Sequence, residues 1–206
     1  NIHQRLKTLY IYSKYKNIKL IYIMDSPLSD GDINNVLGDF TPILYSDLKN
    51  YSFIEELLKK DYDWRVILLE TKQNNGHWVC IMRVPDDKYV YFNSYGDSYN
   101  KDLYLIPRVL RKILGQNENY LNNLLKDKDV EYSKTKFQGD KSAVCGRYVV
   151  FFIDFICNLK HSLGYTIKFL KDTKKKLGLK TYDETIIQLT NKVKPTDIKL
   201  NLLPSD

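Results

Sequence analysis

An apolar run in the second half of the chain most limits how this sequence can fold. Tyr148 to Ile153 are all apolar, and Phe155 and Ile156 continue the run beyond Asp154. A membrane-spanning helix needs about 20 consecutive apolar residues, so this interrupted run is too short to cross a bilayer. The run therefore predicts a mostly buried helix over Cys145–Leu159, packed inside a folded domain.

The overall composition agrees with a folded domain. The chain has 206 residues, of which 43% are hydrophobic and 28% charged, as in a globular protein with one core. The start shows no signal-peptide pattern, and we expect no membrane segment anywhere. The three cysteines are an odd number and predict free thiols in a reducing compartment. Three histidines and no C-x-x-C pattern predict no metal site.

Local patterns predict strands in the middle of the chain and helices on both sides, which is an α+β arrangement. The expected strands are Lys19–Met24, Trp64–Glu70, His77–Val84, Tyr89–Asn93 and Val130–Phe137. The expected helices are one capped by Ser29 and ending at Gly38, one capped by Ser52 and running through Lys60, then Pro107–Leu114, Glu118–Leu125, Cys145–Leu159, Ile167–Leu177 and Glu184–Val193. The last residues, with Pro195 and Pro204, predict an irregular tail.

A predicted hairpin brings a histidine and an asparagine together. Pro85–Lys88 has the composition of a turn between two strands. A turn centred near Asp86 places residue 79 opposite Asn93, so His77 lies on the same face, diagonal to Asn93. An Asn93 carbonyl there can accept from one imidazole nitrogen and leave the other free as a base. A register shifted by one residue would turn Asn93 to the other face.

A polar segment, Gln138–Gly146, leads into the predicted buried helix and puts Cys145 in its first turn. A helix N-terminus stabilises the thiolate, which is the reactive form of cysteine, and a neighbouring imidazolium does the same. The Gln138 amide can donate to a developing oxyanion alongside the Cys145 backbone N–H, a role worth about 2.7–4 kcal/mol in other enzymes.

Each of these residues also has a purely structural interpretation. A cysteine in a buried helix is usually a small hydrophobe, and we assign that role to Cys80 and Cys157. A lone strand histidine is usually structural, and His3 and His161 have no catalytic context. Trp78 can equally be a core residue.

Three segments together resemble the adenovirus-type maturation protease family, adenain, and the wider clan that includes proteases specific for SUMO and NEDD8. They are Gly76-His77-Trp78-Val79, similar to the family's Gly-x-His-Trp region; Tyr91–Ser98, similar to the segment that supplies the third catalytic residue; and Gln138–Gly146, similar to Gln-Gly-x-x-Ser-Ala-x-Cys-Gly around the nucleophile. The chain order agrees, and the matched stretch spans about residues 64–157.

Two departures from the family are visible. Asn93 stands where adenain has an acid, and an amide orients a histidine without adding charge. The adenovirus enzyme forms a disulfide with an activating peptide through a cysteine upstream of the nucleophile. No cysteine lies between Cys80 and Cys145 here, so that covalent activation is not expected.

The resemblance implies a papain-like, adenain-like cysteine protease fold, with a central mixed β-sheet flanked by helices and the nucleophile at a helix N-terminus. It implies one domain over residues 1–206, with a core at about 64–160 and flanking extensions 1–60 and 161–206. The implied catalytic residues are His77, Asn93, Gln138 and Cys145. Gly76 and Trp78 would bind substrate in a narrow channel that favours Gly-containing sites, without any metal or other obligatory cofactor.

The same resemblance implies a biological setting. The protein would be an endopeptidase that cleaves capsid or core precursor proteins during maturation of a double-stranded DNA virus, such as a virophage. We expect a monomer that acts in the virion and in the host cytoplasm or virus factory.

Charge is concentrated in the second half of the chain. Residues 1–103 carry 13 Lys/Arg against 14 Asp/Glu, whereas residues 104–206 carry 19 against 11. A one-sided basic surface favours a polyanion partner, so DNA or a viral peptide is a candidate activator. The lysines between Lys168 and Lys176 are about equally well explained as a solvated helix face.

Two other functions fit these residues. The same catalytic set could serve a deSUMOylating or deubiquitinating protease that acts on host ubiquitin-like modifiers. Alternatively, a catalytically inactive protease fold could bind nucleic acid or capsid protein, and it would show salt-sensitive DNA binding without thiol-dependent cleavage.

Overall fold

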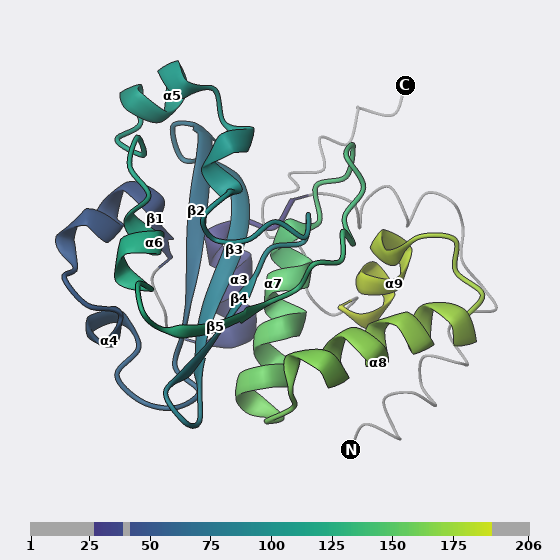
Figure 1. The fold of residues 1–206 in the computed structure, drawn as a ribbon. Helices are drawn as coiled ribbons and strands as arrows, with labels where there is room; N and C mark the ends of the chain where they lie inside the picture. The colour runs from purple at the N-terminus through teal and green to yellow at the C-terminus, as the bar shows by residue number, and fades with distance from the viewer. Residues whose placement is uncertain (1–26, 39–41, 191–206) are drawn as a thin grey trace, which may run out of the picture.

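The computed structural model describes residues 27–38 and 42–190, which form an α+β fold around a five-stranded mixed sheet (Figure 1). The strands, in sheet order, are β1 (Ile43–Leu44), β2 (Trp64–Lys72), β3 (Asn75–Val84), β4 (Lys88–Phe92) and β5 (Asp129–Tyr132). The three central strands are antiparallel, and β1 and β5 pair in parallel at the two edges. The predicted α+β class and mixed sheet are thus confirmed, whereas Lys19–Met24 and the predicted C-terminal tail lie outside the described residues.

Helices cover both faces of this sheet (Figure 1). The α-helices are α3 (Asp30–Leu37), α4 (Ile54–Leu57), α5 (Arg108–Ile113), α6 (Tyr120–Leu124), α7 (Cys145–Ile153), α8 (Leu163–Lys176) and α9 (Tyr182–Leu189). Two 3-10 turns, η1 (Tyr45–Asn50) and η2 (Asp102–Leu105), and a π-helical turn, η3 (Asp154–Asn158), complete the set. One hydrophobic cluster joins the sheet to α3, α7, α8 and α9, and a second joins it to η1, α4 and α6.

Strand β2 shows why the central strands are apolar at successive positions. Val66 and Leu68 belong to the cluster on the α7 side, whereas Ile67 and Leu69 belong to the opposite cluster. Successive strand side chains point to opposite faces, so a strand covered on both sides needs apolar residues throughout.

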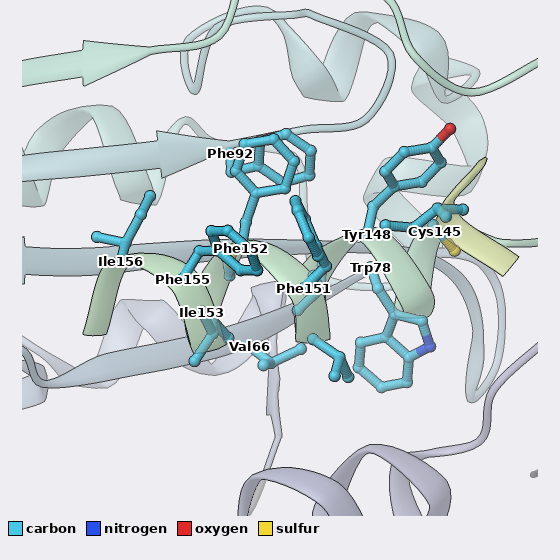
Figure 2. Close-up of a cluster of buried hydrophobic side chains, with 14 of the residues drawn as sticks. Val66, Trp78, Phe92, Cys145, Tyr148, Phe151, Phe152, Ile153, Phe155 and Ile156 are labelled. Atoms are coloured by element: carbon cyan, nitrogen blue, oxygen red, sulfur yellow. The ribbon is translucent and has the colours of Figure 1, made fainter. Parts of the chain in front are cut away.

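The apolar run forms the centre of the α7-side core (Figure 2). All nine residues of α7 are buried, and the Phe152 ring stacks on Phe92 of β4 with 3.6 Å between centroids. The predicted buried helix is therefore confirmed over Cys145–Ile153, after which the chain continues as the π-helical turn η3 to Asn158.

Several predicted boundaries were wrong by a few residues. Ser29 does cap α3 and Gly38 ends it, as predicted. Ser52, however, does not cap α4; its backbone N–H donates to Glu56, and the helix begins after Phe53. Strand β5 ends at Tyr132, five residues early, because the Phe137 N–H donates to the Ser94 carbonyl instead of to a strand.

Helices α8 and α9 begin earlier than predicted because polar caps precede them. Ser162 accepts from the Tyr165 N–H at the start of α8, and Thr181 forms a capping box with Glu184 at the start of α9. At the other end of α9, the buried Arg147 guanidinium of α7 donates to the Thr190 carbonyl at 3.0 Å. Much of the predicted C-terminal extension therefore packs on the same core as α7.

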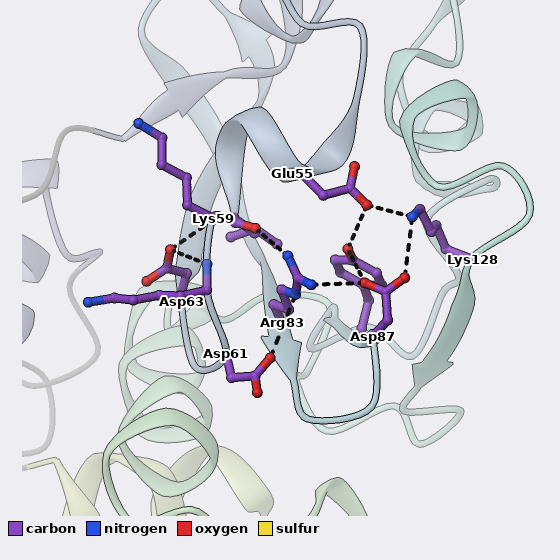
Figure 3. A network of polar contacts seen from close by, with 10 residues as sticks. Glu55, Lys59, Asp61, Asp63, Arg83, Asp87 and Lys128 are labelled. Atoms are coloured by element: carbon purple, nitrogen blue, oxygen red, sulfur yellow. Dashed lines mark hydrogen bonds and ion pairs between the residues drawn. The ribbon is translucent and has the colours of Figure 1, made fainter.

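The tight end of the β3–β4 hairpin is held by an ionic network (Figure 3). Asp86 and Asp87 both have positive φ, which Asp tolerates in a tight turn. Asp87 pairs with Arg83 at 3.1 Å and with Lys128 at 3.4 Å. This turn fixes the pairing Cys80↔Phe92, which is the register predicted from the sequence. His77 and Asn93 lie at the opposite end of the hairpin.

Candidate active site

The structure contains the hydrogen bond predicted between His77 and Asn93. His77 Nε2 lies 2.8 Å from Asn93 Oδ1, and Asn93 is only 1% exposed. His77 is near the start of β3, opposite Leu69 of β2, and Asn93 follows the last residue of β4. The hairpin register therefore creates this pair, as the period-two geometry of strands requires.

Two more contacts fix which way the Asn93 amide faces. Its Oδ1 also accepts from the Tyr95 backbone N–H at 2.9 Å, and its Nδ2 donates to Asp102 Oδ1 at 2.7 Å. With the carbonyl oxygen toward His77, the Nε2 atom of the ring is the donor. The His77 Nδ1 atom is then the nitrogen that can accept a proton.

Cys145 is the first residue of α7 and is 6% exposed. Burial raises the pKa of its thiol above the ordinary value, while the backbone amides of Trp78, Gly146 and Cys145 itself act in the opposite direction. The amides are the expected effect of a helix N-terminus, but burial outweighs them. Burial also lowers the pKa of His77 to about 4, against the opposing Asn93 hydrogen bond. Both shifts favour the uncharged forms, a thiol at Cys145 and a neutral imidazole at His77.

Trp78 connects this end of α7 to the segment before α3. Its indole N–H donates to the Leu28 carbonyl at 3.1 Å, and the residue is 8% exposed. Figure 2 shows the indole ring near the Cys145 end of α7. A Cβ added to Gly146 would lie 3.0 Å from Leu28 and 3.5 Å from the Trp78 ring, so glycine permits this close packing. Trp78 therefore has a core-packing role, and its substrate-binding role stays a prediction.

Gly76 is required by the pairing of β2 with β3. It faces Glu70, and a Cβ at this position would collide with the Leu69 carbonyl. Substitution would push the two strands apart immediately before His77. Its predicted role in substrate binding is a separate matter, which stays a prediction.

Gln138 is positioned by hydrogen bonds between the loop that follows β5 and the loop that follows β4. Its backbone N–H and that of Phe137 both donate to the Ser94 carbonyl, at 3.0 and 2.8 Å. Gly96, with φ +82°, lets this loop approach, because a Cβ would lie 2.9 Å from the Lys136 nitrogen. The Gln138 side chain accepts from Ser94 Oγ at 2.7 Å.

The Gln138 amide nitrogen has one short and one long contact. It donates to the Ser142 carbonyl at 2.8 Å and lies 3.5 Å from the Tyr95 hydroxyl. The structure thus brings Gln138 to the loop immediately before Cys145. Its oxyanion role stays a prediction.

Tyr95 is a residue that sequence reasoning did not assign a role. Its ring stacks on His77 with 4.6 Å between centroids, and its hydroxyl is near the Gln138 amide. Burial raises the pKa of the Tyr95 hydroxyl, and the nearby Cys145 raises it further. With its backbone N–H on Asn93, Tyr95 therefore contacts His77, Asn93 and Gln138, and its hydroxyl pKa responds to the fourth predicted catalytic residue, Cys145. Tyr95 lies inside the Tyr91–Ser98 segment that resembles the protease family, and this position was the one sequence feature that could have indicated a role in the site.

Two acidic residues also lie next to the site, and no local sequence motif predicts either of them. Asp102 lies behind Asn93, as described above. Asp183 of α9 accepts from the Gly139 backbone N–H at 3.0 Å and from the Tyr148 hydroxyl at 2.9 Å. Asp183 thus ties α9 to both ends of the segment that carries Cys145.

The structure shows no contact between the predicted catalytic residues and the two other cysteines or His161. Cys80 and Cys157 are free, buried members of the α7-side core, as predicted, and burial raises the pKa of both. The His161 ring packs near Phe155 and Tyr165, and His3 lies outside the described residues. Within residues 27–38 and 42–190, no cluster of three or more His, Cys, Asp or Glu could hold a metal ion. No helix in these ranges is long and apolar enough to cross a membrane.

Sequence comparison shows that the chain is a homologue of a virophage protein. It is 33% identical over 177 residues to the Sputnik virophage protein named "Uncharacterized protein V9", covering 84% of this chain and 98% of V9. The chain therefore belongs to the V9 family. No family model matches it.

Proposed function

We propose that this protein is a cysteine endopeptidase with an adenain-like fold, and that it processes capsid or core precursor proteins of a virophage. One observation carries the proposal. His77 makes a part-buried hydrogen bond to Asn93, and the next residue, Trp78, directs its backbone amide at the Cys145 thiol at the start of α7. A nucleophile, a base and a residue that orients the base are the parts that thiol proteases need.

The neutral pair defines the order of proton movements. The Cys145 sulfur attacks the peptide carbonyl carbon while its proton passes to His77 Nδ1, which yields a tetrahedral oxyanion. The imidazolium then gives that proton to the leaving amine as the C–N bond breaks. Water, deprotonated by His77, hydrolyses the thioester and restores the thiol. Asn93 holds the Nε2–H of His77 throughout.

The developing oxyanion needs donors at the start of α7. We assign this role to the Cys145 backbone N–H and the Gln138 amide. Among the described residues, the amide's second N–H has only the long 3.5 Å contact with the Tyr95 hydroxyl, which a substrate oxyanion can replace. Two such donors supply the electrostatic stabilisation typical of acyl-transfer sites.

The proposed substrate follows from two considerations. Gly76 and Trp78 flank His77, and a narrow channel beside them would accept only residues with small side chains, hence Gly-containing sites. Membership of the V9 family supports a virophage context, and for that context we propose capsid or core precursor proteins as the substrates. We accordingly place the protein in the virion and the virus factory, as a monomer.

The basic second half of the chain supports DNA as an activator. Lys171, Lys175 and Lys176 of α8 are exposed, whereas Lys168 pairs with Asp172 and Lys174 lies over the Tyr182 ring. A polyanion bound to this helix would hold the enzyme near packaged genomes. A viral peptide is the other activator that we consider.

Cleavage of Gly-containing peptides by the purified full chain, with and without DNA, tests the proposal. Cys145→Ala should abolish cleavage, whereas Cys157→Ala should retain it because Cys157 lies in η3, which follows the opposite end of α7 from Cys145. Limiting iodoacetamide should label Cys145 first, and His77→Ala should slow that labelling. Equal labelling of all three cysteines, with no cleavage under any condition, would contradict the proposal.

The same assay separates the alternatives. Preferential cleavage of a fluorogenic SUMO or ubiquitin substrate would indicate a protease for ubiquitin-like modifiers. Salt-sensitive DNA binding without any thiol-dependent cleavage would indicate an inactive protease fold that binds nucleic acid.

A further inference from the structure

A buried acid lies directly behind the asparagine of the site. Asp102 opens η2 and is 2% exposed. Its Oδ1 accepts from Asn93 Nδ2 at 2.7 Å, and its Oδ2 has no hydrogen-bond partner among the described residues. The contacts therefore form a chain from Asp102 through Asn93 to His77.

An asparagine can present either its oxygen or its nitrogen to a histidine, since the two ends of the amide have the same shape. A flipped Asn93 would point Nδ2 at His77 and at the Tyr95 backbone N–H, so two donors would face each other. It would also point its oxygen at an oxygen of Asp102. The Asp102 acceptor on one side and the Tyr95 donor on the other exclude the flipped form.

The amide orientation decides the tautomer of His77. An oxygen facing Nε2 requires a proton on Nε2, which leaves the Nδ1 lone pair free. A nitrogen facing Nε2 would move the proton to Nδ1 and remove the base that the mechanism uses. In a serine protease, the wrong histidine tautomer alone costs about four orders of magnitude in turnover.

We propose that Asp102 is a positioning residue: through Asn93 it keeps His77 in the Nε2–H tautomer. The tautomer itself follows from the hydrogen bonds, and only its catalytic consequence rests on the proposed function.

Asp102 acts as the hydrogen-bond acceptor in this arrangement. Burial raises the pKa of its carboxyl well above the ordinary range, Asn93 donates to it, and its charge raises the pKa of the buried Tyr45 hydroxyl. The ionised and the protonated carboxyl both offer an acceptor oxygen, and the Tyr95 N–H keeps the Asn93 oxygen turned away from Asp102 in either state. An amide at this position also offers an acceptor oxygen, so Asp102→Asn should maintain the wild-type tautomer, whereas Asp102→Ala should not.

Nitrogen-15 NMR of the imidazole in the full chain reads the tautomer without any substrate. We expect a single Nε2–H tautomer in the wild type and in Asp102→Asn, and a mixture in Asp102→Ala. Gln116→Ala is the matched control. Gln116 is also fully buried and loses two hydrogen bonds, both to the Glu70 backbone and neither leading to His77. It should keep the wild-type tautomer.

The kinetic constants of the same variants provide a second test. Asp102→Ala should lower kcat by about 10- to 100-fold with KM nearly unchanged, as loss of an outer partner of a reacting group does elsewhere. Asp102→Asn should retain most of the activity.

The outcomes are distinct. A pure Nε2–H tautomer in Asp102→Ala, or a mixture in Asp102→Asn that is as large, would overturn the inference. Should Asp102→Ala fail to fold, the Asp102→Asn spectrum alone still decides. Absence of cleavage in every variant, with the expected tautomers present, would refute the proposed function and leave the role of Asp102 standing.

Discussion

The protonation state of His77 and Cys145 is set by burial more than by their partners. Amides at the start of α7 favour the Cys145 thiolate, and Asn93 favours a charged His77, yet burial moves both pKa values the other way. A charge that leaves water loses more solvation than one or two hydrogen bonds return. Attack by a neutral thiol with His77 as general base follows from this balance.

The pH dependence of stability tests that balance. The pKa of His77 is about 4 in the folded chain, below its ordinary 6.5. Between these values the unfolded chain binds more protons, so the free energy of unfolding should fall as pH drops from 6.5 to 4 and then level off. The loss attributable to His77 is at most about 3 kcal/mol.

Urea unfolding at several pH values in this window, compared with His77→Gln, measures the contribution. The variant should show a flatter pH dependence than the wild type, and the His77 ring should titrate near pH 4 by NMR. A ring that titrates above 6.5 would instead indicate a preformed thiolate–imidazolium pair.

Helix α9 shows how a secondary-structure element outside the matched segments supports the site. Through Asp183 it holds the Gly139 amide and the Tyr148 hydroxyl, so the loop that carries Cys145 is anchored at both ends. Sequence reasoning treated residues 161–206 as an extension of unknown role. The part of it that the structure describes is packed against α7.

Asp183→Ala should therefore weaken both stability and catalysis. Removal of the acceptor leaves a backbone N–H and a tyrosine hydroxyl without their partner, which costs about 1–3 kcal/mol. The proposed peptidase activity should fall as the loop loosens. Asp172→Ala on the exposed face of α8 is the control, and it should change stability by less than about 0.5 kcal/mol. Equal behaviour of the two variants would show that α9 does not support the loop.

Across the whole molecule, the charge distribution separates the proposed chemistry from the proposed DNA contact. Helix α8 lies beyond α7 as seen from the sheet (Figure 1), and its Lys171, Lys175 and Lys176 are exposed. Binding that depends on such lysines is electrostatic and weakens with salt in proportion to the phosphates contacted.

Charge-reversal variants test whether DNA binds to helix α8 or to any basic part of the surface. Glu at Lys171, Lys175 and Lys176 should lower DNA affinity and reduce the slope of log affinity against log salt by about 3. Glu at the exposed Lys59, Lys60 and Lys72 gives the same net charge elsewhere, and it should reduce affinity much less. Equal losses in both triple variants would show that α8 is not the DNA-binding surface.

Local patterns were sufficient for the hairpin, the buried helix and the pairing of His77 with Asn93. A strand has a period of two, and a tight turn fixes the register, so two positions on neighbouring strands can be related by counting. The apolar run around Phe152 is long enough to indicate a buried helix without any knowledge of its partners. Boundaries such as the end of β5 were wrong because they depend on bonds to distant loops.

The other members of the site could not be located by counting positions along neighbouring strands. Tyr95, Asp102 and Asp183 come from a loop, a 3-10 turn and a distant helix, and each reaches the site through packing between segments far apart in the chain. The protonation states were also out of reach, since they depend on burial, and burial is a property of the assembled core. Residue types and strand periodicity are local, whereas desolvation and long-range hydrogen bonds exist only once the layers have packed.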